Sequence, residues 1–318
     1  MIAVIGEASP RVEDRKFLTG AGKYLDDLEF PDVCHAVFIR SPYAHARILS
    51  LSAAIAKEMP GVLDIITADD VELSKLNALK PFVQENPNTG EAFSFVEQPL
   101  LARNVARYQG EPIVLVVAET VAQALDASEV VEIEFSPLPH VVNAKEAASS
   151  DSIKLNSQLD ENIAVKWNTG NSQEIENVFN SANNVVKLTV QNQRIVTNPM
   201  EPRGVVAEWN ISTGRYTLYG SSQNIHVMRT CVADMLGVAD ASVRFIAPDV
   251  GGGFGSKNFC YTEYGLIAWM SKRLGRPVKW IASRSEGFLS DHQGRDHQSE
   301  AQLALGKDGR FLALKVLI

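Results

Sequence analysis

Residues 248–258 read PDVGGGFGSKN, with glycine at four of the five positions from 251 to 255. Glycine loses more backbone entropy on folding than any other residue, so such a cluster needs a structural reason. The segment follows a strand pattern, VRFIA, and precedes a helical pattern that begins near Tyr261. At such a junction consecutive backbone N–H groups can point at an anionic group, which approaches closely because side chains are missing. The segment therefore predicts an anion-binding loop or, more simply, a structural turn.

The common nucleotide-binding loops do not fit this segment. A P-loop needs Gly-Lys followed by Ser or Thr, whereas this loop ends in GSKN. A GxGxxG fingerprint would need glycine at position 256, which is serine. An anionic cofactor or substrate of another kind remains open.

The second half of the chain surrounds the loop with strands and helices. A hairpin is predicted from GVVAEWN and RYTLYG, which alternate about a turn at Thr213 and Gly214. Apolar residues at helical spacing predict a helix from Asn224 that Gly237 closes, and a second helix that Gly275 ends. Further strands are predicted from NVVKLTVQNQRIV and PVKWIA.

The first half alternates strands and helices. A strand, GVLDII, leads to a helix that residues Thr67 to Asp70 cap, and EPIVLVVAE predicts a buried strand. TVAQALDASE then has a helical composition and VVEIEF alternates, which indicates an α/β arrangement. Residues 143–171 are polar and rich in Ser and Asn, as in a linker.

The last twenty residues predict a hairpin that turns at Asp308 and Gly309, with a second arm that runs to Ile318. Natural termini are usually polar and frayed. An apolar end inside an element leads us to expect a shortened chain or one piece of a divided subunit.

Composition narrows the class of protein. The 318 residues are 45% hydrophobic and 21% charged, with a net charge of −8, as in a soluble globular protein of two domains that does not bind nucleic acid. No stretch reads as a signal peptide or a membrane span. Three separated cysteines without CxxC and six histidines without HxxxH predict no metal site on these residues, and a cytoplasmic location.

Several ordered motifs resemble the molybdenum-binding large subunit of the xanthine dehydrogenase/aldehyde oxidase family. They are GGGFGSK after VRFIAPDV, SSQN and MEPRG upstream, GRPVKW downstream, and, near the start, RVEDRKFLTGAGKYLDDL, FIRSPYAHARI and QPLLARNVARYQGEPIVLVVAET. The last three are similar to the hammerhead domain of that family. The N-terminal pattern most resembles the large chains of the aerobic carbon monoxide dehydrogenase type.

The resemblance implies a fold and an enzyme class. The fold is α+β (mixed α/β): a hammerhead domain over residues 1–145, a linker over 146–167, and the first part of a molybdopterin-binding domain over 168–318. The activity is hydroxylation or oxidation of a small substrate (an aldehyde, an N-heterocycle or carbon monoxide) with water as the oxygen source. Molybdenum is held by molybdopterin, usually as the cytosine dinucleotide, and electrons pass to partner subunits that carry [2Fe–2S] clusters and FAD.

Individual residues take roles from the same resemblance. Gln223 corresponds to the glutamine that hydrogen-bonds near the oxo ligand of molybdenum, and an amide suits this as an uncharged donor and acceptor. Gly252, Gly253, Phe254 and Gly255 correspond to the loop whose backbone contacts the cofactor, with Phe254 beside the active centre. The alternatives are that Gln223 is an ordinary polar residue at a strand end and that Phe254 is a core aromatic. Arg203 of MEPRG could meet an acidic group or form a structural ion pair. Glu201 and Asp249 lie next to these motifs, but lone carboxylates there are more often capping or ion-pair residues.

Two departures limit what the resemblance implies. Purine-oxidising members carry glutamate directly after the loop lysine, whereas this chain has Asn258, which argues against a purine substrate. The family's general-base glutamate and the copper-bearing cysteine loop of carbon monoxide enzymes would both lie beyond residue 318, and Cys260 is no substitute. We therefore expect no catalytic residue, no stable molybdenum and no turnover in this chain alone.

Two other functions stay open. The chain could be a non-catalytic scaffold subunit of a split enzyme, docking to a polypeptide that carries the C-terminal remainder of the large subunit. It could also be a glycine-loop protein that binds some other anionic ligand.

Overall fold

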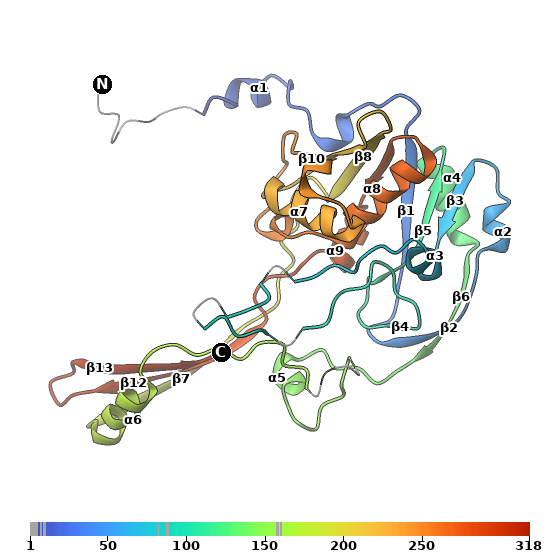
Figure 1. The fold of residues 1–318 in the computed structure, drawn as a ribbon. Helices are drawn as coiled ribbons and strands as arrows, with labels where there is room; N and C mark the ends of the chain where they lie inside the picture. Colours follow the sequence, from blue (N-terminus) through green and yellow to red (C-terminus); the bar gives the residue numbers. More distant parts are fainter. Residues whose placement is uncertain are drawn as a thin grey trace.

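A computed structural model describes residues 6, 8, 11–81, 83–86, 89–93, 95–156, 159 and 161–318. Its largest sheet has seven strands drawn from both halves of the chain. They are β1 (Cys34–Arg40), β3 (Val62–Ile66), β5 (Pro112–Ala118), β8 (Gly204–Asn210), β9 (Arg215–Gly220), β10 (Val243–Ile246) and β11 (Val278–Ile281). Their order across the sheet is β10-β9-β8-β11-β1-β5-β3 (Figure 1).

The two halves of the chain meet where β1 lies beside β11. These strands run parallel, with Cys34 opposite Val278, while β1 is antiparallel to β5 on its other side. The sheet therefore continues from the first half of the chain into the second. The boundaries predicted at residues 145 and 168 remain a prediction.

Strand β5 shows why the sheet lies at the centre of the fold. All seven of its residues are buried. Leu115 and Val117 belong to one apolar cluster, whereas Val114 and Val116 belong to a second cluster. Successive side chains of a strand point to opposite faces, so this continuous apolar run places one core on each side of the sheet.

The longer helices cover these faces. Helix α8 (Thr262–Leu274) packs on β8 and β11, α7 (Ile225–Leu236) packs on β10 and on α8, and α4 (Val121–Glu129) packs on β1 and β5. The other helices are short: α1 (Asp14–Leu18), α2 (Ala54–Lys57), α3 (Ala68–Leu73), α5 (Ala144–Ala147), α9 (Arg284–Ser290), and the 3₁₀ turns η1 (Leu25–Asp27), η2 (Asp240–Ser242) and η3 (Ser256–Asn258). Within the described ranges no helix has the length and apolar character to cross a bilayer.

The expected helix ends are confirmed. Thr67 and Asp70 form a capping box at the start of α3, and the Asn224 side chain accepts from the Val227 N–H at the start of α7. Gly237 and Gly275 close α7 and α8 in the left-handed conformation, with φ of 64° and 65°. These positions explain why the sequence alone delimits both helices.

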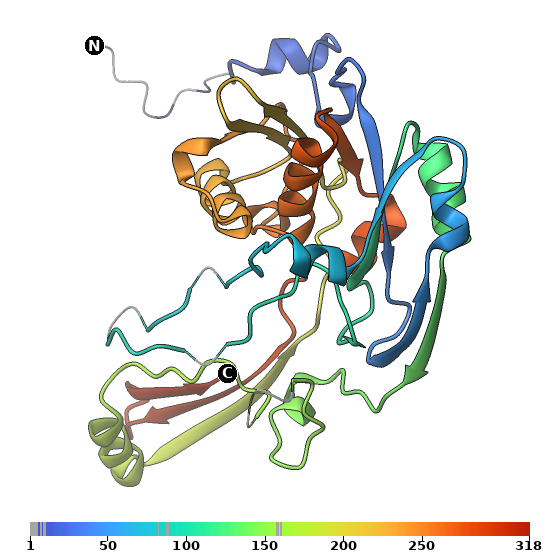
Figure 2. The same ribbon diagram turned by 45° about the vertical axis from the view of Figure 1, so that its right-hand side comes forward.

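Two small sheets complete the fold. One contains β4 (Val105–Ala106), β2 (Ala46–Ser52) and β6 (Glu132–Pro137), and the other contains β13 (Phe311–Leu317), β12 (His297–Leu305) and β7 (Asn184–Asn192). Helix α6 (Ser172–Ser181) packs against β13, and this second sheet projects away from the seven-stranded sheet (Figure 2). Strands β12 and β13 pair antiparallel, which confirms the hairpin predicted at the end of the chain.

Candidate functional site

The glycine cluster lies where the sequence places it, between β10 and α8. It leaves the sheet after Ile246, passes through the short turn η3 and reaches the helix at Thr262. Gly252, Phe254 and Gly255 have φ of 95°, 49° and 99°. An L-residue with a side chain rarely adopts this region, so Gly252 and Gly255 are needed for backbone conformation, and Phe254 is held in a strained one.

The other two glycines are needed for close approach. A Cβ atom on Gly251 would lie 2.5 Å from Cβ of Glu201, and one on Gly253 would lie 2.4 Å from Oε1 of Gln223. Both distances are too short for real atoms, so a side chain at either position would displace its neighbour. The cluster therefore exists to fold tightly and to bring the backbone against Glu201 and Gln223.

Gln223 contacts the loop at two points. Its side-chain Oε1 accepts a hydrogen bond of 2.9 Å from the Gly255 N–H, and its backbone N–H donates at 2.9 Å to the Lys257 carbonyl. The residue is exposed, and its Nε2 group donates to no acceptor in the described part of the chain. The carboxamide is thus fixed at its oxygen and keeps its N–H groups for a ligand.

Three consecutive backbone N–H groups of the loop also lack an acceptor among the described residues. The Gly251 N–H donates to Glu201 at 2.8 Å and the Gly255 N–H donates to Gln223. Between them, the N–H groups of residues 252, 253 and 254 have no acceptor among the residues that the structure describes. The side chain of Phe254 is 72% exposed beside them, so it is not a core aromatic. This donor set suits an anionic, oxygen-rich ligand.

Glu201 anchors the loop from beneath. Its Oε2 accepts from Lys257 Nζ at 2.9 Å, from the Gly251 N–H and from the Ser221 hydroxyl, while Oε1 accepts from the Leu25 N–H at 3.2 Å. Lys257 is completely buried, and burial lowers the pKa of its ammonium group against the opposing effect of Glu201. The carboxylate therefore supplies the counter-charge that lets the ammonium remain charged inside the fold.

Asp249 fastens the loop to the N-terminal segment. Its Oδ2 accepts from the Lys23 N–H at 2.7 Å, and its Oδ1 pairs with Lys16 Nζ at 2.5 Å. The hydrogen bond from Lys16, followed by that from Lys23, lowers the pKa of the Asp249 carboxyl. Residues far from the loop in sequence thus help to set its position.

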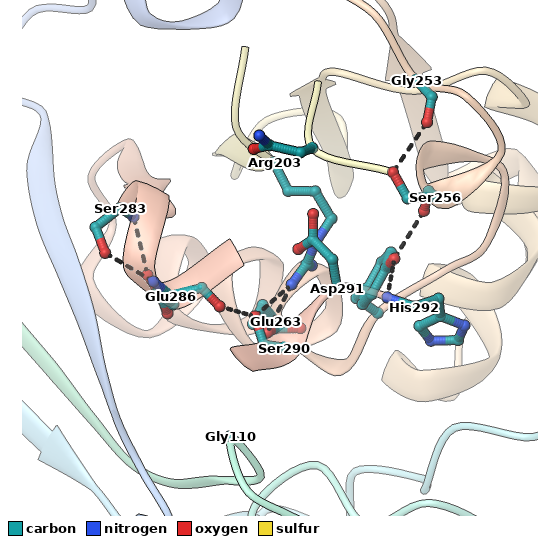
Figure 3. Close-up of polar contacts among 12 residues, drawn as sticks. Gly110, Arg203, Gly253, Ser256, Glu263, Ser283, Glu286, Ser290, Asp291 and His292 are labelled. Atoms are coloured by element: carbon teal, nitrogen blue, oxygen red, sulfur yellow. Dashed lines mark hydrogen bonds and ion pairs between the residues drawn. The ribbon is translucent and has the colours of Figure 1, made fainter. Parts of the chain in front are cut away.

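Arg203 forms a structural ion pair. Its guanidinium is fully buried and lies 2.5 Å from Asp291 Oδ1 (Figure 3). It is also stacked 3.5 Å above the ring of Tyr261. The Tyr261 hydroxyl in turn donates to the Ser256 carbonyl at 2.7 Å. Arg203 therefore supports the C-terminal end of the loop.

Glu263 joins this cluster to the first half of the chain. It lies 3.6 Å from Arg203 (Figure 3). It also pairs with Arg40 at 2.6 Å, and Arg40 contacts Glu286 as well. Burial by itself would raise the pKa of Glu263, but Arg40 and Arg203 lower it to about 2. The cluster ties β1 to α8 and α9, and this keeps the scaffold beneath the loop in place.

The structure thus brings together all five residues predicted to bind a cofactor, Gln223, Gly252, Gly253, Phe254 and Gly255. The sequence did not assign the support that Glu201 and Lys257 give the loop. The available signal was that both residues lie within the motifs MEPRG and GGGFGSK. However, the residue types alone, a lone carboxylate and a lysine, do not predict that the two side chains are buried together. In the described ranges no group of three or more His, Cys, Asp or Glu residues is placed to hold a metal ion.

Comparison with known proteins identifies the two halves. Residues 155–318 match the family model of the molybdopterin cofactor-binding domain, and residues 19–139 match the aldehyde oxidase and xanthine dehydrogenase a/b hammerhead domain. The nicotine 6-hydroxylase large subunit of Paenarthrobacter nicotinovorans is 34% identical over 98% of this chain and 37% of its own length. The carbon monoxide dehydrogenase large chain of Afipia carboxidovorans is 32% identical over 96% of this chain and 38% of its own.

Solved structures give the same result. Quinoline 2-oxidoreductase from Pseudomonas putida 86 superposes with a TM-score of 0.86 at 35% identity, covering 97% of this chain and 38% of that one. The Cu,Mo-CO dehydrogenase superposes with a TM-score of 0.88 at 32% identity, covering 97% of this chain and 39% of that one. The chain therefore spans less than two fifths of the length of these relatives.

Proposed function

Because this chain belongs to the xanthine dehydrogenase/aldehyde oxidase family of molybdopterin-binding large subunits, we propose that Gln223 and residues 252–255 form part of its cofactor site. The observation that carries the proposal is the set of three consecutive N–H groups, at 252, 253 and 254, without an acceptor in the described chain and beside the fixed Gln223 carboxamide. Backbone and amide donors of this kind suit the oxygen atoms of a phosphate or a metal oxo group.

The residues of this chain bind and orient the group. When bound, molybdopterin supplies molybdenum redox chemistry that oxidises a carbon centre with water as the oxygen source. The loop amides would hold its oxygen atoms, and the Nε2 group of Gln223 would donate to it while Oε1 accepts from the Gly255 N–H. Glu201 and Lys257 keep the loop backbone in its tight conformation.

The assembly proposed around this chain is a cytoplasmic molybdenum hydroxylase. The C-terminal remainder of a large subunit provides the general-base glutamate, an iron–sulfur subunit and an FAD subunit accept electrons, and the pterin is the cytosine dinucleotide. The substrate is a small aldehyde, an N-heterocycle or carbon monoxide. Asn258, in the place of the purine-associated glutamate, favours substrates other than purines.

The second candidate is a non-catalytic scaffold subunit of a split enzyme. In that case another polypeptide would supply the part of the large subunit that the chain does not cover, since it spans 37–38% of the length of two curated relatives. On either reading, this chain purified by itself retains no molybdenum and has no turnover.

The test is metal and pterin analysis of the complex that this chain forms with the rest of a large subunit. We expect stoichiometric molybdenum in the wild type and a several-fold loss in Gly253→Ala, whose new Cβ would displace Gln223 Oε1. Gly294→Ala is the matched control, because a Cβ there meets nothing within 4 Å. Full molybdenum in the Gly253→Ala complex would refute the loop as a cofactor site, and an assembled complex without pterin would favour the scaffold.

A further inference from the structure

A cavity of about 250 Å³ lies beside the glycine loop, and residues from both halves of the chain line it. Asn258 and Phe259 come directly after the loop, and Asn224 comes directly after Gln223. The Gln223 N–H donates to the Lys257 carbonyl at 2.9 Å, so the segments that carry Asn224 and Asn258 lie side by side. The cavity therefore adjoins the residues that we propose bind the cofactor.

The wall of the cavity is mostly apolar and encloses room for a small ring. An engineered apolar cavity of about 150 Å³ in another protein holds one benzene molecule. A volume of about 250 Å³ therefore admits an aromatic ring with a small substituent. The described residues that line it are Leu79, Lys80, Pro81, Val96, Gln98, Asn224, Val227, Cys231, Asn258, Phe259, Cys260 and His292.

Three neutral side chains supply hydrogen-bonding groups to this wall. The Asn258 carboxamide makes no hydrogen bond with any residue that the structure describes. Asn224 accepts from the Val227 N–H at 3.3 Å through Oδ1, and its Nδ2 group donates to no described residue. The His292 ring stacks on that of Phe259 with centroids 5.1 Å apart, and neither of its nitrogens has a hydrogen-bond partner in the same ranges. The site thus offers both donors and acceptors.

The wall carries no spare charge. Among the described residues that line the cavity, Lys80 has the only formal charge, and its ammonium group lies 3.4 Å from Asp234 Oδ2. Desolvation, followed by the Arg203 charge, lowers the pKa of His292, so its ring is neutral at pH 7. A charged ligand would leave water for a wall without a free counter-charge, and this costs free energy that a neutral ligand does not lose.

We propose that this cavity binds an uncharged, planar aromatic molecule that carries an amide-like donor and acceptor. Its ring packs against Val227, Phe259 and His292, and its amide edge exchanges hydrogen bonds with Asn224 and Asn258. The role of this molecule as substrate rests on the proposed function, because the adjoining loop must then hold the oxidising group. Asn258 determines which charge state of the ligand the cavity accepts.

Three probes of one shape test the proposal on the chain without any cofactor. They are 4-fluorobenzamide, 4-fluorobenzoate and 4-fluorobenzamidine, which are neutral, anionic and cationic at pH 7, and fluorine NMR titrations measure the dissociation constant of each. We expect saturable binding of the amide that is about tenfold tighter than that of either charged probe. Equal affinity for all three probes, or no saturable binding of the amide, would refute the proposal.

Two variants and a control locate the probe in the cavity. Asn258→Asp adds a negative charge to the wall, so it should weaken binding of the amide several-fold and strengthen binding of the amidine several-fold. Asn104→Asp adds the same charge at an exposed position outside the cavity, and should bind all three probes as the wild type does. Val227→Phe fills part of the cavity and should abolish binding of the amide. Wild-type affinities in Asn258→Asp would overturn the proposal.

The cavity and the cofactor loop can fail separately in these experiments. The molybdenum content of the Gly253→Ala complex tests the loop, whereas the probe titrations test the cavity. In a complex that holds molybdenum, Val227→Phe should keep the metal and lose the amide probe. Binding of the amide by a complex that holds no molybdenum would support the cavity as a binding site and refute its role as the substrate site.

Discussion

The ammonium group of Lys257 lies 2.9 Å from the Glu201 carboxylate, with the lysine side chain fully buried and the carboxylate 12% exposed. The same carboxylate oxygen accepts the Gly251 N–H. One ion pair thus connects the MEPRG motif to both ends of the glycine cluster. Since an unpaired charge inside a protein is costly, the pair is expected to determine both stability and the shape of the loop.

Replacing Glu201 by glutamine should destabilise the chain. The substitution keeps the shape of the side chain but leaves the Lys257 charge without its partner, and breaking a buried pair in this way costs about 3–5 kcal/mol. Urea denaturation measures the loss. Glu176→Gln is the control, because Glu176 pairs with Lys315 where both side chains are about half exposed, and such a pair contributes about 0–1 kcal/mol. Equal losses of unfolding free energy in the two variants would show that the buried Glu201–Lys257 pair contributes no more to stability than an exposed pair.

Local structure could be predicted because its signals are local. The capping residues Thr67 and Asp70, the helix-ending glycines Gly237 and Gly275, and the hairpin turn at Gly214 each act within a few positions of themselves. For the same reason the glycine cluster could be placed between a strand and a helix. The residue types of these short segments determine their backbone conformation.

Long-range pairing could not be predicted. Nothing in the residue pattern shows that β1 lies parallel to β11, with Cys34 opposite Val278, because that contact joins positions 244 apart. The burial of Arg40 and Lys257 was hidden as well. Charged residues are expected at the surface, and only the neighbouring Glu263 and Glu201, brought there by the fold, make their burial tolerable.

The stability of the chain should depend on Glu263 in acid. Arg40 and Arg203 hold the pKa of this buried carboxyl at about 2, below the usual 4.5, despite the opposing effect of burial. Because the pKa of Glu263 is lower in the folded chain than in the unfolded chain, the ionised carboxylate stabilises the folded state. This stabilisation is complete above pH 4.5 and is lost as the pH falls towards 2. The shift corresponds to about 3 kcal/mol.

Denaturation curves of wild type and Glu263→Gln at several pH values test this. The wild type should be more stable by about 3 kcal/mol at pH 7, and the gap should narrow steadily between pH 4.5 and 2. Glu176→Gln again serves as the exposed control, with no such narrowing expected. A gap that stays constant down to pH 2 would contradict the assigned pKa.

Substituting Gly251 by alanine should strain the contact between the loop and Glu201. The new Cβ would lie 2.5 Å from Glu201 Cβ and 3.4 Å from its backbone nitrogen, so relief requires movement of the Glu201 main chain as well. Overpacking of this kind costs about 1–3 kcal/mol. Thermal unfolding of Gly251→Ala measures the cost, and Gly294→Ala, with open space around its Cβ, should unfold as the wild type does.

Asp249→Asn should loosen the N-terminal segment. Asp249 accepts from the Lys23 N–H at 2.7 Å and from Lys16 Nζ at 2.5 Å, and both bonds weaken when the carboxylate loses its charge. Local opening exposes a segment to proteases. Limited trypsin digestion should therefore cut after Lys16 and Lys23 several-fold faster than in the wild type, while cleavage elsewhere is unchanged. Asp308→Asn, which removes the partner of Arg310 in the distant β12–β13 turn, is the control, and equal cleavage after Lys16 and Lys23 in both variants would show that Asp249 does not hold the segment.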